Sequence, residues 1–126
     1  MAVFGIKLLT VHTELVRMDY SEKNLVNKAK KYVREHYAED INVTSVAHGI
    51  HNEFKYLSKC FVKNGGESLT LYINRTRVQA AVELMKTGDG KIYDVAKKVG
   101  YQNPTYFSKI FKKITGKTPA EYISGK

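Results

Sequence analysis

Residues 56–73 read Tyr56-Leu-Ser-Lys-Cys-Phe-Val-Lys-Asn-Gly-Gly-Glu-Ser-Leu-Thr-Leu-Tyr-Ile73, and a second copy of this stretch follows later in the chain. The copy reads Tyr106-Phe-Ser-Lys-Ile-Phe-Lys-Lys-Ile-Thr-Gly-Lys-Thr-Pro-Ala-Glu-Tyr-Ile123, at an offset of 50 residues without a gap, and 8 of the 18 positions are identical. Upstream, Val46-Ala47 corresponds to Val95-Ala96 at an offset of 49. Such self-similarity indicates two copies of one structural unit.

Apolar residues in and before the first copy recur at three- and four-residue intervals, which predicts helices rather than strands. A helix is expected from about Ser21 to the segment 37–40. Asn42 is the expected N-cap of a short helix that follows it. A longer helix is then expected over residues 53–63, stopped by Gly65-Gly66. Its buried face carries Leu57, Cys60 and Phe61.

The second copy repeats this order of elements. A short helix carries Ile92, Val95, Ala96 and Val99. The next helix has Asn103 as its cap and Pro104 at its first position, where proline is favoured. A last short segment is expected over residues 118–123. Each unit is therefore a helix–turn–helix in which the second helix is the longer one.

One long helix, expected over residues 69–86, joins the two units. At ~1.5 Å per residue it spans roughly 26 Å. The predicted fold class is all-α, with two helix-turn-helix subdomains on a long linker helix, homeodomain-like and with about seven helices. The expected boundaries are an N-terminal extension or linker (1–20), the first subdomain (21–66), the linker helix (67–88) and the second subdomain (89–126).

Several residues have expected structural roles. Gly66 and Gly116 follow the long helix of each unit, so we expect them to be C-caps with positive φ. Tyr72 and Tyr122 occupy the same repeat position and are expected to anchor the two cores. Arg77 is expected to form a structural ion pair.

Composition limits the class of protein. The chain has 126 residues, a single cysteine and a net charge of +9. One cysteine excludes an internal disulfide, and His48, His51 and Cys60 are too few ligands for a metal site, so no metal is expected. No run approaches the ~20 apolar residues of a membrane span. With no export signal, we expect a cytoplasmic location and no membrane partner.

The positive charge gathers on the face of each long helix that lies opposite its core. On the first helix this face carries Lys55, Ser58, Lys59 and Val62, and on the second it carries Thr105, Ser108, Lys109 and Lys112. Neither face has an acid, whereas an ordinary solvated face mixes signs. Since the second helix of a helix-turn-helix enters the major groove of DNA, double-stranded DNA is the expected partner.

The expected DNA contacts fall into two classes. Lysine, serine and threonine side chains can donate to base edges, so the residues expected to read bases are Lys55, Ser58, Lys59, Thr105, Ser108 and Lys109. Other polar or basic residues near these helices position the protein on the backbone. The residues expected to contact phosphate are Lys63, Arg75, Asn103, Lys112 and Lys113.

The stretch Ile92-Tyr-Asp-Val-Ala-Lys-Lys-Val-Gly-Tyr-Gln-Asn-Pro-Thr-Tyr-Phe-Ser-Lys-Ile-Phe-Lys-Lys-Ile-Thr-Gly-Lys-Thr-Pro-Ala-Glu-Tyr122 resembles the signature of the AraC/XylS family of bacterial transcription regulators. The resemblance covers about residues 24–123. It implies two units that bind adjacent major-groove segments together, and contact with RNA polymerase, usually as an activator. The second unit is also similar to output domains of response regulators.

The first unit departs from the family pattern at its turn. His51 stands where glycine is frequent, Asn52 where an apolar residue is frequent, Glu53 at the usual Ser/Thr cap, and Phe54 where proline is frequent. A carboxylate is chemically adequate as a cap, but it repels a nearby phosphate. We therefore expect the first unit to dock less tightly than the second or to read DNA differently.

Two other functions stay open at this point. One or both units could bind a protein partner as a helical interaction module, or bind nucleic acid without sequence preference. No motif of an enzyme is present, and no cofactor or small-molecule site is expected. The 20 residues before the first unit are too few for an effector-binding or receiver domain. A stand-alone regulator and the output part of a larger protein both fit, as do activation and repression.

Overall fold

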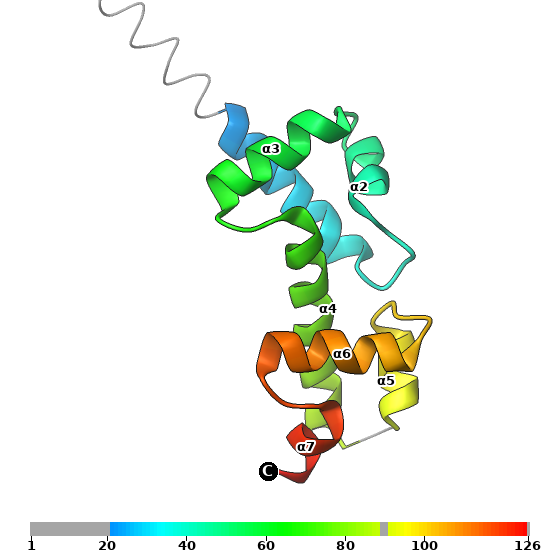
Figure 1. The fold of residues 1–126 in the computed structure, drawn as a ribbon. Coiled ribbons are helices and arrows are strands. Elements are labelled where there is room, and N and C mark those ends of the chain that lie inside the picture. The colour runs from blue at the N-terminus through cyan, green and yellow to red at the C-terminus, as the bar shows by residue number, and fades with distance from the viewer. Residues whose placement is uncertain (1–20, 89–90, 126) are drawn as a thin grey trace, which may run out of the picture.

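The computed structural model describes residues 21–88 and 91–125, and all regular structure within these ranges is helical. After a helix formed by residues 21–36 come α2 (Val43–Gly49), α3 (Phe54–Gly65), α4 (Leu69–Lys86), α5 (Ile92–Lys98), α6 (Pro104–Thr115) and α7 (Pro119–Ser124). The predicted all-α class is confirmed, with two helix-turn-helix units along one long helix (Figure 1). The expectation for residues 1–20 lies outside the described residues. No helix in the described ranges is both long and apolar enough to cross a membrane.

Each unit has its own hydrophobic core. The first core is built from the helix 21–36, α2, α3 and the beginning of α4, and Leu57 and Phe61 are fully buried in it. The second core is built from the end of α4, α5 and α6, with Phe107 and Phe111 fully buried. Tyr37 packs against both cores. The molecule is therefore two small cores placed one after the other along α4.

The long helix α4 belongs to both cores. Leu69 and Ile73 are buried in the first core, and Val78 and Ala81 are buried in the second. The change of partner falls between Ile73 and Val78, at the middle of the helix. The helix is thus a structural part of both units, and its interior face continues from one core into the next.

The helix ends follow the sequence closely. Asn42 caps α2, and its side-chain oxygen accepts a hydrogen bond from the Ser45 amide at 2.9 Å. Gly66 and Gly116 end α3 and α6 with φ of 76° and 86°, as predicted for glycine C-caps. The helix α3 begins one residue later and ends two residues later than the periodicity predicts. Its last two residues, Asn64 and Gly65, are not apolar, so the periodicity of apolar residues cannot predict that they are helical.

The expected pair of tyrosine anchors is only half right. Tyr72 packs against the first core, with its ring centroid 5.5 Å from that of Phe61. Tyr122 is 37% exposed and meets Phe111 only with its edge, at 5.6 Å between centroids. The prediction that Tyr122 anchors a core is wrong, because α7 is the last element of the described fold and no further helix covers its outer side.

The expected ion pair of Arg77 is also wrong. Arg77 is only 8% exposed, and in the described residues it pairs with no carboxylate. Its Nε donates to the carbonyl oxygen of Tyr37 at 2.8 Å, and its Nη2 donates to the carbonyl oxygen of Glu39 at 2.9 Å. The partners are backbone groups, which no pattern of charged residues in the sequence could reveal.

Candidate nucleic-acid interface

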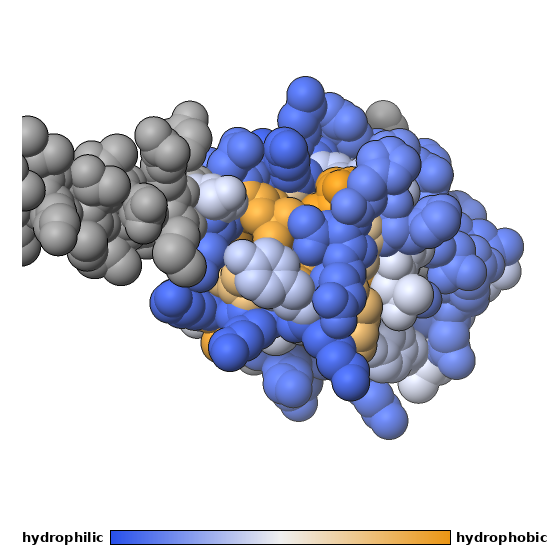
Figure 2. Space-filling model, turned by 90° about the horizontal axis from the view of Figure 1, so that it is seen from above, coloured by the Kyte–Doolittle hydropathy of each residue, from blue (hydrophilic) through white to orange (hydrophobic). Residues whose placement is uncertain are grey.

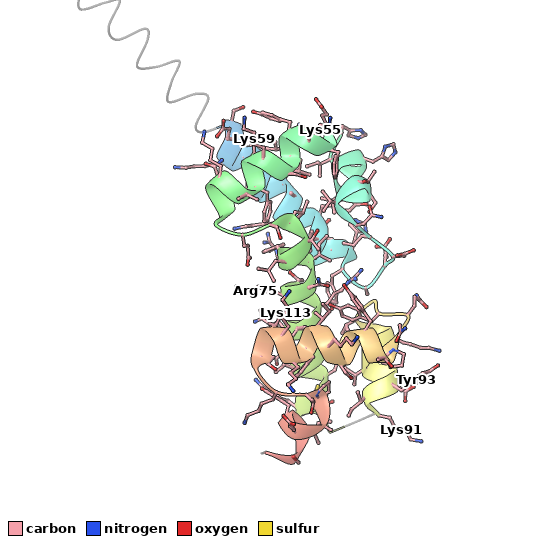
Figure 3. All side chains as sticks on the ribbon, in the orientation of Figure 1. Lys55, Lys59, Arg75, Lys91, Tyr93 and Lys113 are labelled. Carbon is pink, nitrogen blue, oxygen red and sulfur yellow. The ribbon has the colours of Figure 1, made fainter. Side chains whose placement is uncertain are left out.

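The exposed face of α3 carries the basic residues that the sequence predicts. Leu57, Cys60 and Phe61 are buried against the first core, so the opposite side of the helix faces solvent. Lys55 and Lys59 are exposed on that side, and Figure 3 shows both along α3. The predicted base-reading residue Ser58 is half-buried between the two faces.

The helix α6 repeats this arrangement in the second unit. Phe107 and Phe111 are buried, and the opposite side carries exposed Thr105 and Lys109. Ser108 is half-buried, as Ser58 is in the first unit. Lys112 and Lys113 are exposed in the last turn of the helix. The two faces therefore share the serine and the lysine at two of their positions (Ser58/Ser108 and Lys59/Lys109), and all six predicted base-reading residues lie on α3 or α6.

The two helices also have the same relation to the rest of the molecule. In Figure 1, α3 and α6 each run across the view from the side of their own short helix, α3 near the beginning of α4 and α6 across its middle. Each packs against the short helix of its own unit, α2 for α3 and α5 for α6, and both contact α4. Two acid-free helices joined through one long helix form a surface that can meet two successive segments of one elongated anion.

The N-terminus of α6 is capped, whereas that of α3 is not. The Oδ1 atom of Asn103 accepts hydrogen bonds from the amides of Thr105 at 2.8 Å and Tyr106 at 3.2 Å. Asn103 thus has a structural role, and only the nitrogen of its side-chain amide is left to donate to a phosphate. Glu53 stands at the equivalent place before α3, but its carboxylate makes no capping hydrogen bond. The expectation that it is an adequate cap is wrong.

Two of the predicted phosphate-binding residues already have acidic partners. Lys63 Nζ lies 3.2 Å from a carboxylate oxygen of Glu22. Arg75 Nη1 lies 3.1 Å from a carboxylate oxygen of Glu67. Both basic side chains remain more than half exposed, whereas the side chains of Glu22 and Glu67 are only 17% and 20% exposed. A phosphate that contacts Lys63 or Arg75 therefore meets a basic group that already has a largely buried acidic partner.

Two basic side chains lie close together where the two units meet. Figure 3 shows Arg75 of α4 and Lys113 of α6 at the level where α6 crosses α4. Lys113 is exposed near the end of α6 and lines one pocket with Leu71 and Asn74 of the first half of α4. Positive charge therefore extends between the two recognition faces as well as along them.

Two exposed apolar residues of α3 belong to none of the predicted DNA contacts. Phe54, the first residue of the helix, is 46% exposed, and Val62 is 54% exposed. The repeat gives the signal that could have found them, because Pro104 and Lys112 stand at the matching positions of α6. The surface of α3 is therefore more apolar than that of α6, and the two helices suit different contacts.

A basic and aromatic cluster on α5 was also missed. Tyr93 is 50% exposed, and Lys97 Nζ lies 4.7 Å from its ring centroid. Hydrogen bonding to Tyr93 raises the pKa of Lys97 above its usual value. Lys91 is exposed just before the helix, on the same side of the molecule as Tyr93 (Figure 3). The spacing of Tyr93 and Lys97, one helical turn apart, was the available signal.

The described residues offer little for metal or thiol chemistry. Cys60 is 3% exposed and packs in the first core. Within residues 21–88 and 91–125, no three side chains of His, Cys, Asp or Glu come close enough to hold a metal ion.

Comparison with known proteins gives a consistent result. A family model described as a helix-turn-helix domain matches residues 46–125. The chain is 31% identical over 115 residues to an uncharacterized HTH-type transcriptional regulator, YisR of Bacillus subtilis, and the match covers 91% of this chain and 40% of YisR. The chain thus spans less than half the length of that relative, and 35%, 32% and 46% of the length of three other curated relatives.

Two solved structures show the same fold. The C-terminal domain of AraT, a response regulator from Geobacillus stearothermophilus, superimposes with a TM-score of 0.77 at 30% identity, covering 81% of this chain and 85% of that one. The DNA-binding domain of the global transcriptional factor AdpA, solved in complex with a target DNA, superimposes with a TM-score of 0.74 at 22% identity, covering 79% of this chain and 90% of that one.

Proposed function

Since this chain belongs to the AraC/XylS family of helix-turn-helix transcription regulators, we propose that it recognises a specific double-stranded DNA sequence by placing α3 and α6 in adjacent major-groove segments. The observation that carries this proposal is the pair of matching acid-free faces on one chain. Groove segments on one face of B-DNA repeat every ~34 Å, or 10–10.5 base pairs. Two units in series on α4 suit that repeat.

The residues divide between reading bases and holding the backbone. Thr105 lies in the first turn of α6, the part of a recognition helix that approaches base edges, and Lys109 lies one turn further on along the same face. Lys55, Ser58 and Lys59 of α3, together with Ser108 of α6, take the equivalent role. Lys63, Arg75, Asn103, Lys112 and Lys113 contact phosphates, and Lys63 and Arg75 exchange a carboxylate for a phosphate when DNA binds.

The two units contribute unequally. In the first unit, the exposed Phe54 and Val62 favour apolar contact with thymine methyl groups, whereas the matching part of α6 is cationic. Glu53 stands before α3, and its carboxylate makes no capping hydrogen bond. We expect this carboxylate to lie beside the DNA backbone and to repel a phosphate there. We therefore expect most of the affinity to come from the second unit and a part of the specificity to come from the first.

A second function has a specific observation in its favour. The same exposed Phe54 and Val62 suit a protein partner that covers α3 while α6 binds DNA. Salt separates the two cases, because binding to DNA phosphates weakens steeply with salt and an apolar protein interface does not. A partner seated on α3 would also leave only one half of a DNA motif recognised.

The proposal extends to the setting in which the domain acts. By membership in the family, we propose an activator that contacts RNA polymerase, that meets its operator in the bacterial cytoplasm and that performs no catalysis with this domain. The relatives are longer than the described match, so the activity of a whole regulator is proposed only for the part that binds DNA.

The test is selection of bound duplexes from a random DNA pool, with the affinity of the winners measured at two salt concentrations. We expect a bipartite motif with halves about one helical turn apart and a steep loss of affinity with salt. A motif of a single half would support the alternative in which α3 binds protein. Weak binding without an enriched sequence would overturn specific recognition altogether.

A further inference from the structure

A side chain in the middle of α4 connects the two units directly. Among the described residues, Arg77 is the one charged side chain in the buried interior, at 8% exposure. It projects from α4 at the point where the helix passes from the first core to the second. Burial of a guanidinium costs free energy unless its donors are satisfied, so its partners indicate what the burial achieves.

On one side Arg77 holds the first unit. Its Nε and Nη2 donate to the carbonyl oxygens of Tyr37 and Glu39, at 2.8 and 2.9 Å. These carbonyls belong to the segment that follows the helix 21–36, where backbone acceptors are left without helical partners and the helix dipole is negative. The planar guanidinium can bond both carbonyls at once, which an ammonium group cannot do with the same geometry.

On the other side Arg77 holds the second unit. Its guanidinium carbon lies 5.1 Å from the ring centroid of Tyr101, a cation–π distance. Tyr101 is 3% exposed and belongs to the turn between α5 and α6. Its hydroxyl donates to Oδ1 of Asn74 on α4 at 2.7 Å, one turn before Arg77. The turn that leads into α6 is thus fixed to the same part of α4.

The backbones of the two units also approach each other at this point. A Cβ atom on Gly100 would lie 2.6 Å from the carbonyl oxygen of Tyr37 and 3.0 Å from Nε of Arg77. Only glycine therefore allows the turn of the second unit to approach the loop of the first. Three segments meet at Arg77: the loop after the helix 21–36, the middle of α4 and the turn before α6.

We propose that Arg77 is the positioning residue that fixes the angle between the two helix-turn-helix units and thereby sets the half-site spacing that the protein accepts. The inference rests on the proposed function, since spacing matters only if both units bind one DNA. α3 and α6 each pack on their own core, so their relative placement depends on α4, on Tyr37, which packs against both cores, and on the contacts of Arg77. A rigid pair gives a high effective concentration for one spacing and a low one for the others.

The DNA test compares Arg77→Met with Val78→Ala on duplexes that carry the two selected half-sites at the native spacing or with 1, 2 or 5 base pairs inserted. Methionine keeps the apolar stem and removes the donors, whereas Val78→Ala weakens the second core and keeps every donor of Arg77. We expect Arg77→Met to bind an isolated half-site as the wild type does. It should lose at least tenfold in affinity at the native spacing and should discriminate poorly between spacings, while Val78→Ala keeps the wild-type preference.

A measurement without DNA separates this proposal from the proposed function. Spin labels at Lys31→Cys and Lys98→Cys, in a Cys60→Ala background, report the distance between the units. We expect a narrow distance distribution that Arg77→Met broadens and Arg77→Lys broadens less. A distribution that stays narrow in Arg77→Met, or an unchanged spacing preference, would overturn the role of Arg77. If no bipartite DNA site exists but Arg77→Met broadens the distance distribution, the proposed function is wrong, and Arg77 still fixes the relative position of the two units.

If Arg77→Met does not fold, Arg77→Lys carries both readouts. It retains the charge and loses the two-carbonyl geometry, so it should give a smaller loss of affinity at the native spacing and a partly flattened spacing preference. A folded Arg77→Lys protein that behaves as the wild type in both assays would overturn the proposal.

Discussion

His51 and Gly100 occupy corresponding positions in the turns of the two units, and both have positive φ, 56° and 105°. His51 is the one residue other than glycine in this region of backbone conformation among residues 21–88 and 91–125. A side chain in the left-handed region costs roughly 1–2 kcal/mol, because its Cβ crowds the backbone. The first turn therefore holds strain that the second turn avoids.

His51→Gly should stabilise the protein. The variant removes the strain of the left-handed conformation, and the greater flexibility of glycine in the unfolded chain offsets ~0.5–1 kcal/mol of the gain. We expect the free energy of unfolding in urea to rise by up to about 1 kcal/mol. A fall would mean that the imidazole makes a contact that outweighs the strain.

Gly100→Ala should destabilise the protein more than Gly116→Ala does. Both glycines have positive φ, but a Cβ on Gly116 meets nothing within 4 Å, whereas one on Gly100 would lie 2.6 Å from the Tyr37 carbonyl oxygen. Gly116→Ala should cost ~1–2 kcal/mol for the backbone alone, and Gly100→Ala a further 1–3 kcal/mol for the clash. Equal losses in urea unfolding would show that the two units are not in close contact at Gly100.

Tyr101 makes stability depend on pH in the alkaline range. Burial raises its pKa to about 12, so between pH ~10 and 12 the folded state retains a proton that the unfolded chain has released. The contribution of Tyr101 is complete below pH ~10 and is lost as the pH rises toward 12. Tyr101→Phe should be less stable than the wild type at pH 8, since Asn74 loses its donor, and the difference should shrink between pH 10 and 12.

The control for that titration is Tyr122→Phe, which removes a hydroxyl from a side chain that is 37% exposed. Unfolding curves for the three proteins at pH 8, 10 and 11 suffice. A gap between the wild type and Tyr101→Phe that stays constant over this range would show that Tyr101 titrates in the folded protein as it does in the unfolded chain.

Lys109→Ala tests whether α6 reads bases. If Lys109 donates to a base edge, the variant should lose ~1–3 kcal/mol on the selected site and should stop discriminating at one base position. Lys31→Ala is the matched control, because Lys31 is an exposed lysine on the helix 21–36 and its removal changes the net charge equally. A loss of the same size on every sequence would assign Lys109 to a phosphate.

Exchanging Val62 and Lys112 tests whether the two units contribute unequally to DNA affinity. The two residues occupy the same repeat position, and both are exposed, so each tolerates the other side chain. We expect Val62→Lys to raise DNA affinity and to steepen its salt dependence by about one phosphate contact, a slope of ~0.9, and Lys112→Val to do the reverse. Unchanged slopes in both variants would place this helical position away from the DNA backbone.

The sequence predicts the helices and their exposed faces well because both depend on local patterns. Leu57 and Phe107 stand at the same repeat position, and the periodicity around them is enough to place Lys59 and Lys109 in solvent. The lengths of the helices follow from caps such as Asn42 and Gly66, which act within one turn.

What the sequence does not predict depends on contacts between distant segments. The partners of Arg77 are carbonyl groups 40 and 38 residues away, and any residue type can supply them. Glu53 makes no capping hydrogen bond. Whether its exposed carboxylate turns toward the helix or toward solvent depends on the orientation of the side chain, which the sequence does not specify. The exposure of Tyr122 depends on which elements cover the end of the fold.

The most direct test of the account is a hydroxyl-radical footprint of the protein on its selected duplex. Simultaneous insertion of α3 and α6 predicts two protected patches on one face of the DNA, with centres about 10 base pairs apart. Both patches should appear at the same protein concentration, since the two units belong to one chain. A single patch, or a second patch that appears only at much higher concentration, would contradict the claim that the two units bind DNA as one body.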